Sequence, residues 1–184
     1  MAGEVRFIPG AEFRALAPKM RKAPKDVRKA VNLGIRQATK PAEQALKAAV
    51  LGLDSTGARG GGSGQRKLHQ VSRSKSKRPV RAGVGAAHGL RRNIAKGITR
   101  KITYTGKTQG VRIRADAKYL PDAQRVLVKA TNRGKVRHPV YGGDTWVNQT
   151  FTPEGWFDHT MDREGPAVRD KIAQVATEAM RKLQ

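Results

Sequence analysis

The chain has 184 residues, of which 38% are hydrophobic and only 5% aromatic, so we expect one domain with a small core. It carries 38 Lys or Arg against 14 Asp or Glu, a formal net charge of +24, which favours polyanions, anionic surfaces or acidic proteins as partners. Cysteine is absent, which excludes disulfides, thiolate metal sites and cysteine nucleophiles. No apolar stretch reaches the length of a membrane span or follows Met1 as a secretory signal, so we expect no membrane partner.

The N-terminal part is predicted to be mainly helical. A short strand at Val5–Ile8 precedes a helix that Pro18 should disrupt. Pro24 suits the first turn of a longer helix that ends near Gly52 and that Pro41 should kink. The apolar residues of this long helix recur at close to 3.6-residue spacing and lie on one stripe: Val27, Val31, Ile35, Ala38, Ala42, Leu46 and Val50.

A basic segment without acids follows this helix. The 61 residues from Ser55 to Ala115 contain 16 Lys or Arg and no Asp or Glu. Residues 54–88 are rich in Gly and Ser and have little to bury, so they predict a long, basic, flexible arm inserted in the domain. The candidates for contact with a polyanion or an acidic partner are Arg66, Lys67, Arg73, Lys75, Lys77, Arg78 and Arg81 in the arm, then Arg91 and Arg92 after it.

The remaining sequence predicts strands and a closing helix. Ile98–Tyr104 and Val111–Ala115 alternate as the two strands of a β-hairpin, whose other face carries Lys101, Arg112 and Arg114. A short helix from Leu120 should turn Ala123, Val126 and Leu127 inward, and Thr145–Phe151 should form a further strand. The last helix is expected to have Pro166 in its first turn.

These elements predict an α+β fold in a single domain, residues 1–184. It combines a long N-terminal helix, a small antiparallel sheet that includes the hairpin, a C-terminal helix and the long basic flexible insertion.

The residues give little support to catalysis. Asp158, His159 and Asp162 could hold a metal or act as general acids, but a charged segment before the last helix is the simpler interpretation. The glycines of Gly57–Gly64 lack the Gly-Lys-Ser/Thr ending of a phosphate-binding loop. We therefore expect no enzyme, and no catalytic residue, cofactor or metal.

Five of the nine aromatic residues lie between Val140 and Asp158. They could form a base-stacking platform, but a core corner beside a protein interface is the favoured interpretation. The candidate subunit-interface residues in and beside this cluster are Arg137, His138, Tyr141, Trp146, Trp156 and Phe157.

Several short motifs resemble one virion protein family. They are Gly89-Leu90-Arg91-Arg92-Asn93-Ile94, then Arg137-His138-Pro139-Val140-Tyr141-Gly142, and Trp146-Val147-Asn148-Gln149 followed by Gly155-Trp156-Phe157. With a helix before and after them, they resemble the tail-component family of tailed bacteriophages, the neck or tail-completion proteins of siphophages, in the version found in phages of actinobacteria. The insertion at residues 54–88 departs from the simplest family pattern.

The resemblance implies a structural protein of the virion neck or tail, made in the host cytoplasm. Such a protein forms a six- or twelve-fold ring in the head–tail connector, joins the portal complex to the tail tube and continues the DNA channel. Its partners would be its own copies and other connector and tail proteins, with nonspecific contact with genomic DNA as a secondary expectation. The alternative function is a nucleic-acid-binding protein without sequence specificity.

Overall fold

We describe the fold from a computed structural model, in which the described residues are 2–7, 11–56, 89–105, 109–120, 122–139 and 146–183. The elements follow in the order β1 (Ala2–Phe7), α1 (Ala11–Lys22), α2 (Lys25–Leu51), β2 (Asp54–Thr56), α3 (Leu90–Gly97), β3 (Ile98–Thr103), β4 (Gly110–Ala115), the 3₁₀ helix η3 (Asp122–Gln124), α4 (Leu127–Asn132), β5 (Lys135–Pro139), β6 (Trp146–Thr152) and α5 (Trp156–Lys182). The predicted α+β class is confirmed. The predicted arm at residues 54–88 lies outside the described residues, apart from β2 at its start.

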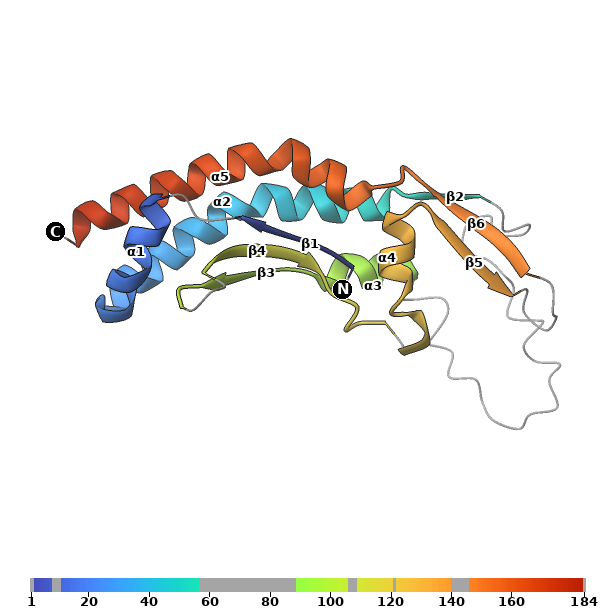
Figure 1. Cartoon of the computed structure of the whole chain (residues 1–184), viewed down its shortest axis with the longest axis horizontal. Helices are drawn as coiled ribbons and strands as arrows, with labels where there is room; N and C mark the ends of the chain where they lie inside the picture. The colour runs from blue at the N-terminus through green and yellow to red at the C-terminus, as the bar shows by residue number, and fades with distance from the viewer. Residues whose placement is uncertain are drawn as a thin grey trace.

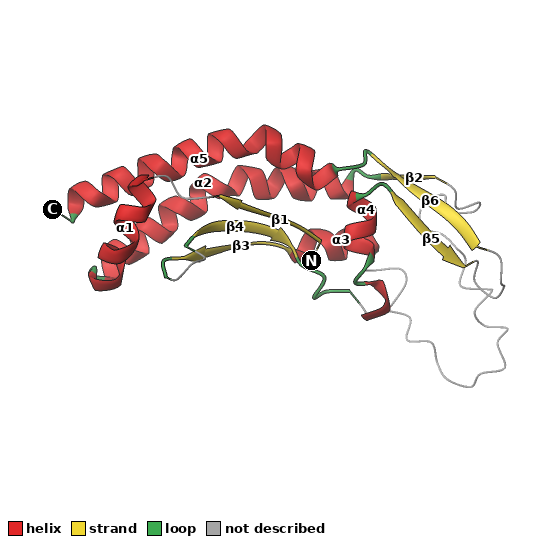
Figure 2. Ribbon diagram, in the orientation of Figure 1, coloured by secondary structure: helices red, strands yellow, loops and turns green. Residues whose placement is uncertain are grey.

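Two long helices extend along most of the molecule (Figure 1). α2 and α5 run side by side along its long axis, with α1 crossing them near one end (Figure 1). Their packing is close, because a Cβ atom on Gly34 of α2 would come within 3.0 Å of Val175 Cγ1 on α5. The helices therefore cover one side of the molecule and the strands lie to the other side and beyond one end (Figure 2).

The predicted apolar stripe of α2 is confirmed. Its seven residues are buried, except for Val27, which is partly buried and packs against the core. The predicted disruption at Pro18 is wrong, because α1 continues through it. α2 also continues through Pro41, where a kink stays a prediction. Both prolines are exposed, so water can hydrate the carbonyl that loses its helical partner, while the neighbouring turns keep their buried contacts.

The hairpin of β3 and β4 is confirmed, and β1 completes it as a three-stranded antiparallel sheet in the order β1-β4-β3, called sheet A here. The inward face of β4 presents Val111, Ile113 and Ala115 to the core beneath α2. The approach to the hairpin is tight, because a Cβ atom on Gly97 would come within 1.9 Å of the carbonyl oxygen of Asp116. Glycine is therefore the residue that lets α3 run directly into β3.

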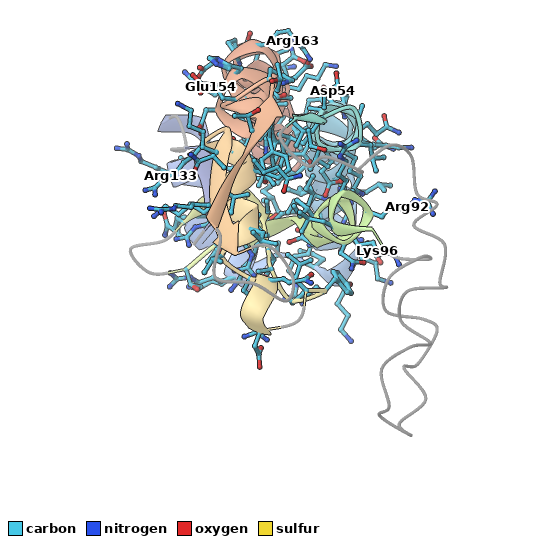
Figure 3. All side chains as sticks on the ribbon, turned by 90° about the vertical axis from the view of Figure 1, so that its right-hand side faces the viewer. Asp54, Arg92, Lys96, Arg133, Glu154 and Arg163 are labelled. Carbon is cyan, nitrogen blue, oxygen red and sulfur yellow. The ribbon has the colours of Figure 1, made fainter. Side chains whose placement is uncertain are left out.

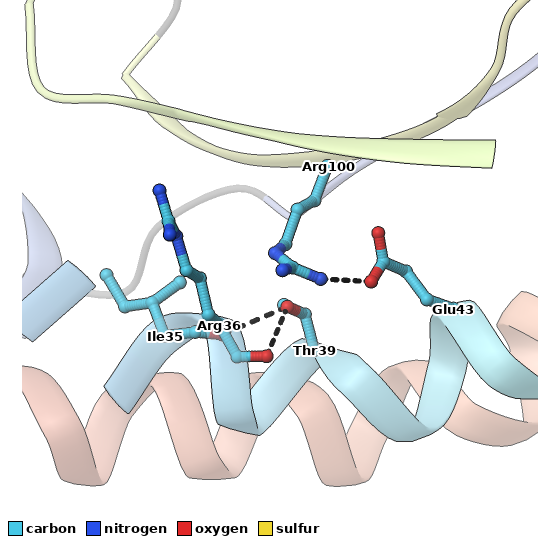
Figure 4. Close-up of polar contacts among 5 residues, drawn as sticks. All are labelled: Ile35, Arg36, Thr39, Glu43 and Arg100. Carbon is cyan, nitrogen blue, oxygen red and sulfur yellow. Dashed lines mark hydrogen bonds and ion pairs between the residues drawn. The ribbon is translucent and has the colours of Figure 1, made fainter. Parts of the chain in front are cut away.

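Arg100 interrupts the inward face of β3 in the sequence, and the structure shows why. It lies opposite Ile113 in the sheet and forms an ion pair with Glu43 of α2 (Figure 4). The two side chains are only 28% and 12% exposed, so each charge offsets the burial of the other. Beside them the Thr39 hydroxyl donates to the carbonyl oxygen of Ile35 at 3.0 Å, which satisfies a buried polar group.

A second three-stranded antiparallel sheet, called sheet B here, has the order β2-β6-β5. The strand β6 was predicted, but β2 and β5 were not. β5 contains one described apolar position, Val136, and β2 contains Asp54, Ser55 and Thr56, so neither shows the alternation that marks a half-buried strand. Both are strands because β6 pairs with them. β5 and β6 are consecutive and form a hairpin, whereas β2 lies far before β6 in the sequence.

Two predicted helix details are wrong. The helix expected from Leu120 is divided into η3 (Asp122–Gln124) and α4, which begins at Leu127, and Val126 between them is 69% exposed where it was expected to face inward. The residues that this helix buries are Val128 and Thr131.

The last helix begins ten residues before Pro166, at Trp156. A proline inside a helix costs about 3 kcal/mol. Each large apolar side chain buried in the turns before it contributes roughly 1.5–3 kcal/mol. Trp156, Phe157 and Met161 are all buried, so the extra turns are favourable in spite of the proline.

Candidate assembly surface

The aromatic segment and the start of α5 meet α4 and sheet B at one end of the molecule. The helix begins after Gly155, which has a left-handed backbone (φ +63°) and no side chain to cap the helix. Asn132, at the end of α4, replaces the missing cap. Its Oδ1 accepts the Phe157 N–H at 2.9 Å and its carbonyl oxygen accepts the Gly155 N–H at 2.6 Å. The corner is therefore held by polar contacts between distant parts of the chain.

Asn132 also forms a hydrogen bond with the side chain of Asp158. Its Nδ2 donates to Asp158 Oδ2 at 2.8 Å, so one amide binds both a backbone donor and a carboxylate in the first turn of α5. Asp158 also lies where the positive end of the helix dipole favours an anion. This arrangement gives Asp158 a structural task and leaves His159 and Asp162 exposed on the helix surface. Among the described residues, no group of three or more His, Asp or Glu could hold a metal ion.

The aromatic residues of this corner divide between core and undescribed positions. Trp156 and Phe157 are 2% and 0% exposed and meet edge to face, with ring centroids 5.7 Å apart. Phe151 of β6 is also buried. Trp156 and Phe157 are thus core residues of the protomer, and their place at a subunit interface stays a prediction. The side chains of His138 and Trp146, and Tyr141 as a whole, lie outside the described residues.

Exposed cations flank this corner. Figure 3 looks at this end of the molecule, with Arg133 on one side and Arg92 and Lys96 of α3 on the other. Arg92 is exposed, whereas Arg91 is half-buried and its Nη2 donates to Ser55 Oγ at 3.4 Å. This contact joins β2 to the first turn of α3, so the two ends of the predicted arm lie next to each other. The arm candidates from Arg66 to Arg81 lie outside the described residues.

The edge strand β5 continues the positive surface. Lys135 and Arg137 are both exposed and alternate along the strand, opposite Thr150 and Asn148 of β6. Charged side chains on an edge strand commonly prevent unwanted pairing with other sheets. The same charges can select an acidic partner, because they make an approach by another basic edge unfavourable.

The outer face of sheet A is basic as the sequence predicted. Lys101 lies opposite Arg112, and both belong to the face turned away from α2. Arg114 forms an ion pair with Asp116 at 3.0 Å, although its side chain is 48% exposed. Like charges directly opposite each other destabilise a sheet slightly, so this face is suited to a partner that carries negative charge.

Asn132, which holds the corner together, was not predicted from the sequence. Asn132 shows no motif, because its partners Gly155, Phe157 and Asp158 lie more than twenty residues later. The one local signal was Gly155, since a glycine directly before an amphipathic run can begin a helix without its own capping side chain.

None of the described helices is both long and apolar enough to cross a bilayer. No protein-family model, no curated protein and no solved structure matches this chain.

Proposed function

We propose that this chain is a subunit of a bacteriophage head–tail connector, of the neck or tail-completion type. It assembles into a ring of six or twelve copies that joins the portal complex to the tail tube and continues the DNA channel. The proposed activity is assembly and not catalysis. The order of the elements supports this, because the family-like motifs fall on α3, on β5 and β6, and at the start of α5, between the two long helices.

One observation carries the proposal. Sheet B extends beyond the ends of α2 and α5 (Figure 1), and none of its residues whose side chains are described belongs to the main apolar core. Its two outer strands, β2 and β5, each have one edge without a strand partner among the described residues. A small sheet that stands off its own core is suited to packing against a neighbour, as in a heterologous interface that closes into a ring.

The first test is the assembly state of the purified chain. We expect closed rings in electron micrographs and a single oligomer mass in mass photometry. Arg137→Glu should reduce ring formation, because it reverses a charge on the edge of sheet B without removing core contacts. Arg169→Glu on the exposed middle of α5 makes the same charge change and should leave the rings intact. A chain that stays monomeric at micromolar concentration would overturn the proposal.

A second test concerns the arm. Neutralising Lys75, Lys77, Arg78 and Arg81 should reduce the joining of heads to tails in an assembly assay and leave the unfolding temperature unchanged, because the segment has few apolar residues to bury. A matching fall in thermal stability would instead place these residues in the folded core.

A nucleic-acid-binding protein without sequence specificity is the second candidate, favoured by the net charge of +24. The assembly state separates the two functions. A monomer that binds DNA tightly at physiological salt supports the second candidate, and a ring that co-assembles with portal or tail proteins supports the first.

A further inference from the structure

The end of the molecule away from sheet B carries a dense group of cations. Six lie within residues 19–29, where α1 ends at Lys22 and α2 begins at Lys25, and all six side chains are exposed. Asp26 is the one acid in this stretch. This group is called the basic elbow here, and it consists of Lys19, Arg21, Lys22, Lys25, Arg28 and Lys29.

Local helix electrostatics explain only half of the basic elbow. Lys19, Arg21 and Lys22 lie in the last turn of α1, where the negative end of the helix dipole favours cations. Lys25 and Arg28 lie at the start of α2, where the positive end of the dipole disfavours them. These positions therefore lower the stability of the helix, which calls for a reason outside the folding of the chain.

No partner within the described part of the chain neutralises the basic elbow. Within the described residues, the ion pairs join acids to Arg100, Arg114, Arg125 and Arg163, which all lie outside the basic elbow. None of the side chains of the basic elbow forms an ion pair or a hydrogen bond with a described residue. Crowded cations without a counter-charge raise the local positive potential, which attracts an anion from solution.

The positive surface continues along α2 as a line of cations, called the outer row of α2 here, in which Lys47 is half-buried and the others are exposed. From Lys29, steps of seven, four and seven residues lead to Arg36, Lys40 and Lys47, which keeps all four on one helix face. The row from Lys29 to Lys47 is about 27 Å long at 1.5 Å per residue. Glu43, the other acid of α2, lies on the same helix face, seven residues after Arg36 and four before Lys47, and is paired with Arg100 of β3. The row thus has the length of several phosphate spacings, and the acid within it, Glu43, is already neutralised by Arg100.

We propose that the basic elbow and the outer row of α2 bind the phosphate backbone of duplex DNA without reading its sequence. The contacts would be ion pairs to phosphates, which need exposed cations and little apolar surface. As an account of where genomic DNA runs past a connector subunit, this inference rests on the proposed function. As a DNA-binding surface of the free chain, it stands on the charges alone.

Other anionic partners fit this surface less well. A helix that lies on a membrane needs an apolar face free to enter the lipid, but Phe13, Leu16 and Met20 of α1 are buried in the core. Protein interfaces centre on clusters of large apolar or aromatic anchors. The exposed large apolar side chains described on α2 are Leu33 and Leu51, which lie too far apart along the helix to form such a cluster.

The test compares two triple variants of the full chain. The elbow variant Lys25→Gln, Arg28→Gln, Lys29→Gln removes three charges from exposed helix positions. The control variant Arg169→Gln, Lys171→Gln, Arg181→Gln removes three charges from exposed positions on α5, and therefore has the same net charge. Binding to a fluorescent duplex of random sequence is measured by anisotropy across a salt titration.

We expect the elbow variant to bind the duplex at least about tenfold more weakly near 0.1 M salt, and the salt dependence of log K to fall by about 2 to 3. The control should change both quantities much less. The elbow variant should also unfold at a higher temperature than the natural chain, because it loses cations at the positive end of α2. Equal weakening by both variants, or none by either, would overturn the inference, since net charge or the arm would then account for binding.

Two further measurements distinguish DNA binding from membrane binding and from ring assembly. The same variants are added to vesicles containing phosphatidylserine, and a selective loss of vesicle binding by the elbow variant, with duplex binding retained, would overturn the inference in favour of a membrane. Mass photometry reports ring formation independently. Rings that persist in the elbow variant while duplex binding falls support both proposals, and a monomer with an elbow-dependent affinity for DNA keeps the inference and rejects the connector.

Discussion

The Tyr104 ring joins α1, α2 and the end of β3 through one side chain. It stacks on Phe13 with ring centroids 5.7 Å apart, and its hydroxyl donates to Asn32 Oδ1 at 2.8 Å. Burial raises the pKa of Tyr104 from 10.0 to about 12. Between these two values the unfolded chain loses the phenol proton while the folded chain keeps it, so the stability that this residue contributes is complete below pH 10 and falls as the pH rises toward 12.

Tyr104→Phe isolates this effect. It removes the ionisable group and keeps the stacked ring, so the variant should lose less stability than the natural chain between pH 9.5 and 11.5. The measurement is the free energy of unfolding in urea at each pH, taken as the difference between the two proteins so that lysine titration cancels. A difference that does not change with pH would show that the phenol titrates alike in both states.

The Asn132 side chain provides the second prediction at this scale. Asn132→Ala should lower the free energy of unfolding by about 1–2 kcal/mol, because the Phe157 N–H and the Asp158 carboxylate lose their partner. Asn148→Ala, at an exposed asparagine of β6, is the comparison, and it should cost less because that side chain is exposed to water. Urea denaturation measures both, and an equal cost for the two would argue against a special capping role.

Helices and strands differ in how far they can be predicted from this sequence. The stripe of α2 is a local pattern that repeats every three or four residues, and it identified buried positions such as Val31 and Leu46 directly. β5 shows no strand pattern of its own and depends on its pairing with β6, and the cap of α5 depends on Asn132, which lies far before it along the chain. The corner could be identified from its aromatic residues. Which of these residues are buried could not be predicted, because the burial of Trp156 depends on elements that pack against it from elsewhere in the chain.

The start of α5 allows a direct test at the scale of the element. If the helix runs continuously from Trp156, Pro166 occupies an interior position, where it lacks an N–H and crowds the preceding turn. Pro166→Ala should then raise the free energy of unfolding, by up to about 3 kcal/mol less what the proline contributes by restricting the unfolded chain. If the helix began at Pro166, the same change would lower stability, because proline suits a first turn. Urea denaturation with circular dichroism gives the sign.

At the scale of the whole molecule, the exposed cations are distributed differently from the buried apolar side chains. The apolar cluster is continuous from α1 through sheet A to α5, whereas exposed cations occupy the basic elbow at one end and α3 with β5 at the other. In the sequence the acid-free segment from Ser55 to Ala115 is the clearest concentration of positive charge. The basic elbow is less evident there, because Asp26 lies among its cations. The structure identifies the basic elbow, because it shows which charged side chains have ion-pair partners within the described residues.

The arm can be removed to test whether the rest of the molecule folds without it. Residues 57–81 contain four apolar side chains, those of Ala58, Leu68, Val71 and Val80. The hydrogen bond between Arg91 and Ser55 holds the described residues on either side of the arm near each other, so a short Gly-Ser linker in place of residues 57–81, together with residues 82–88, can close the gap without strain. We expect cooperative unfolding at nearly the natural temperature, since the linker leaves the apolar cluster intact and shortens a loop. Ring formation and duplex binding, measured on the same protein, then report what the arm adds to the basic elbow and to sheet B. Loss of cooperative unfolding would mean that the arm belongs to the core, and the charges of Lys75 to Arg81 would then have a structural role.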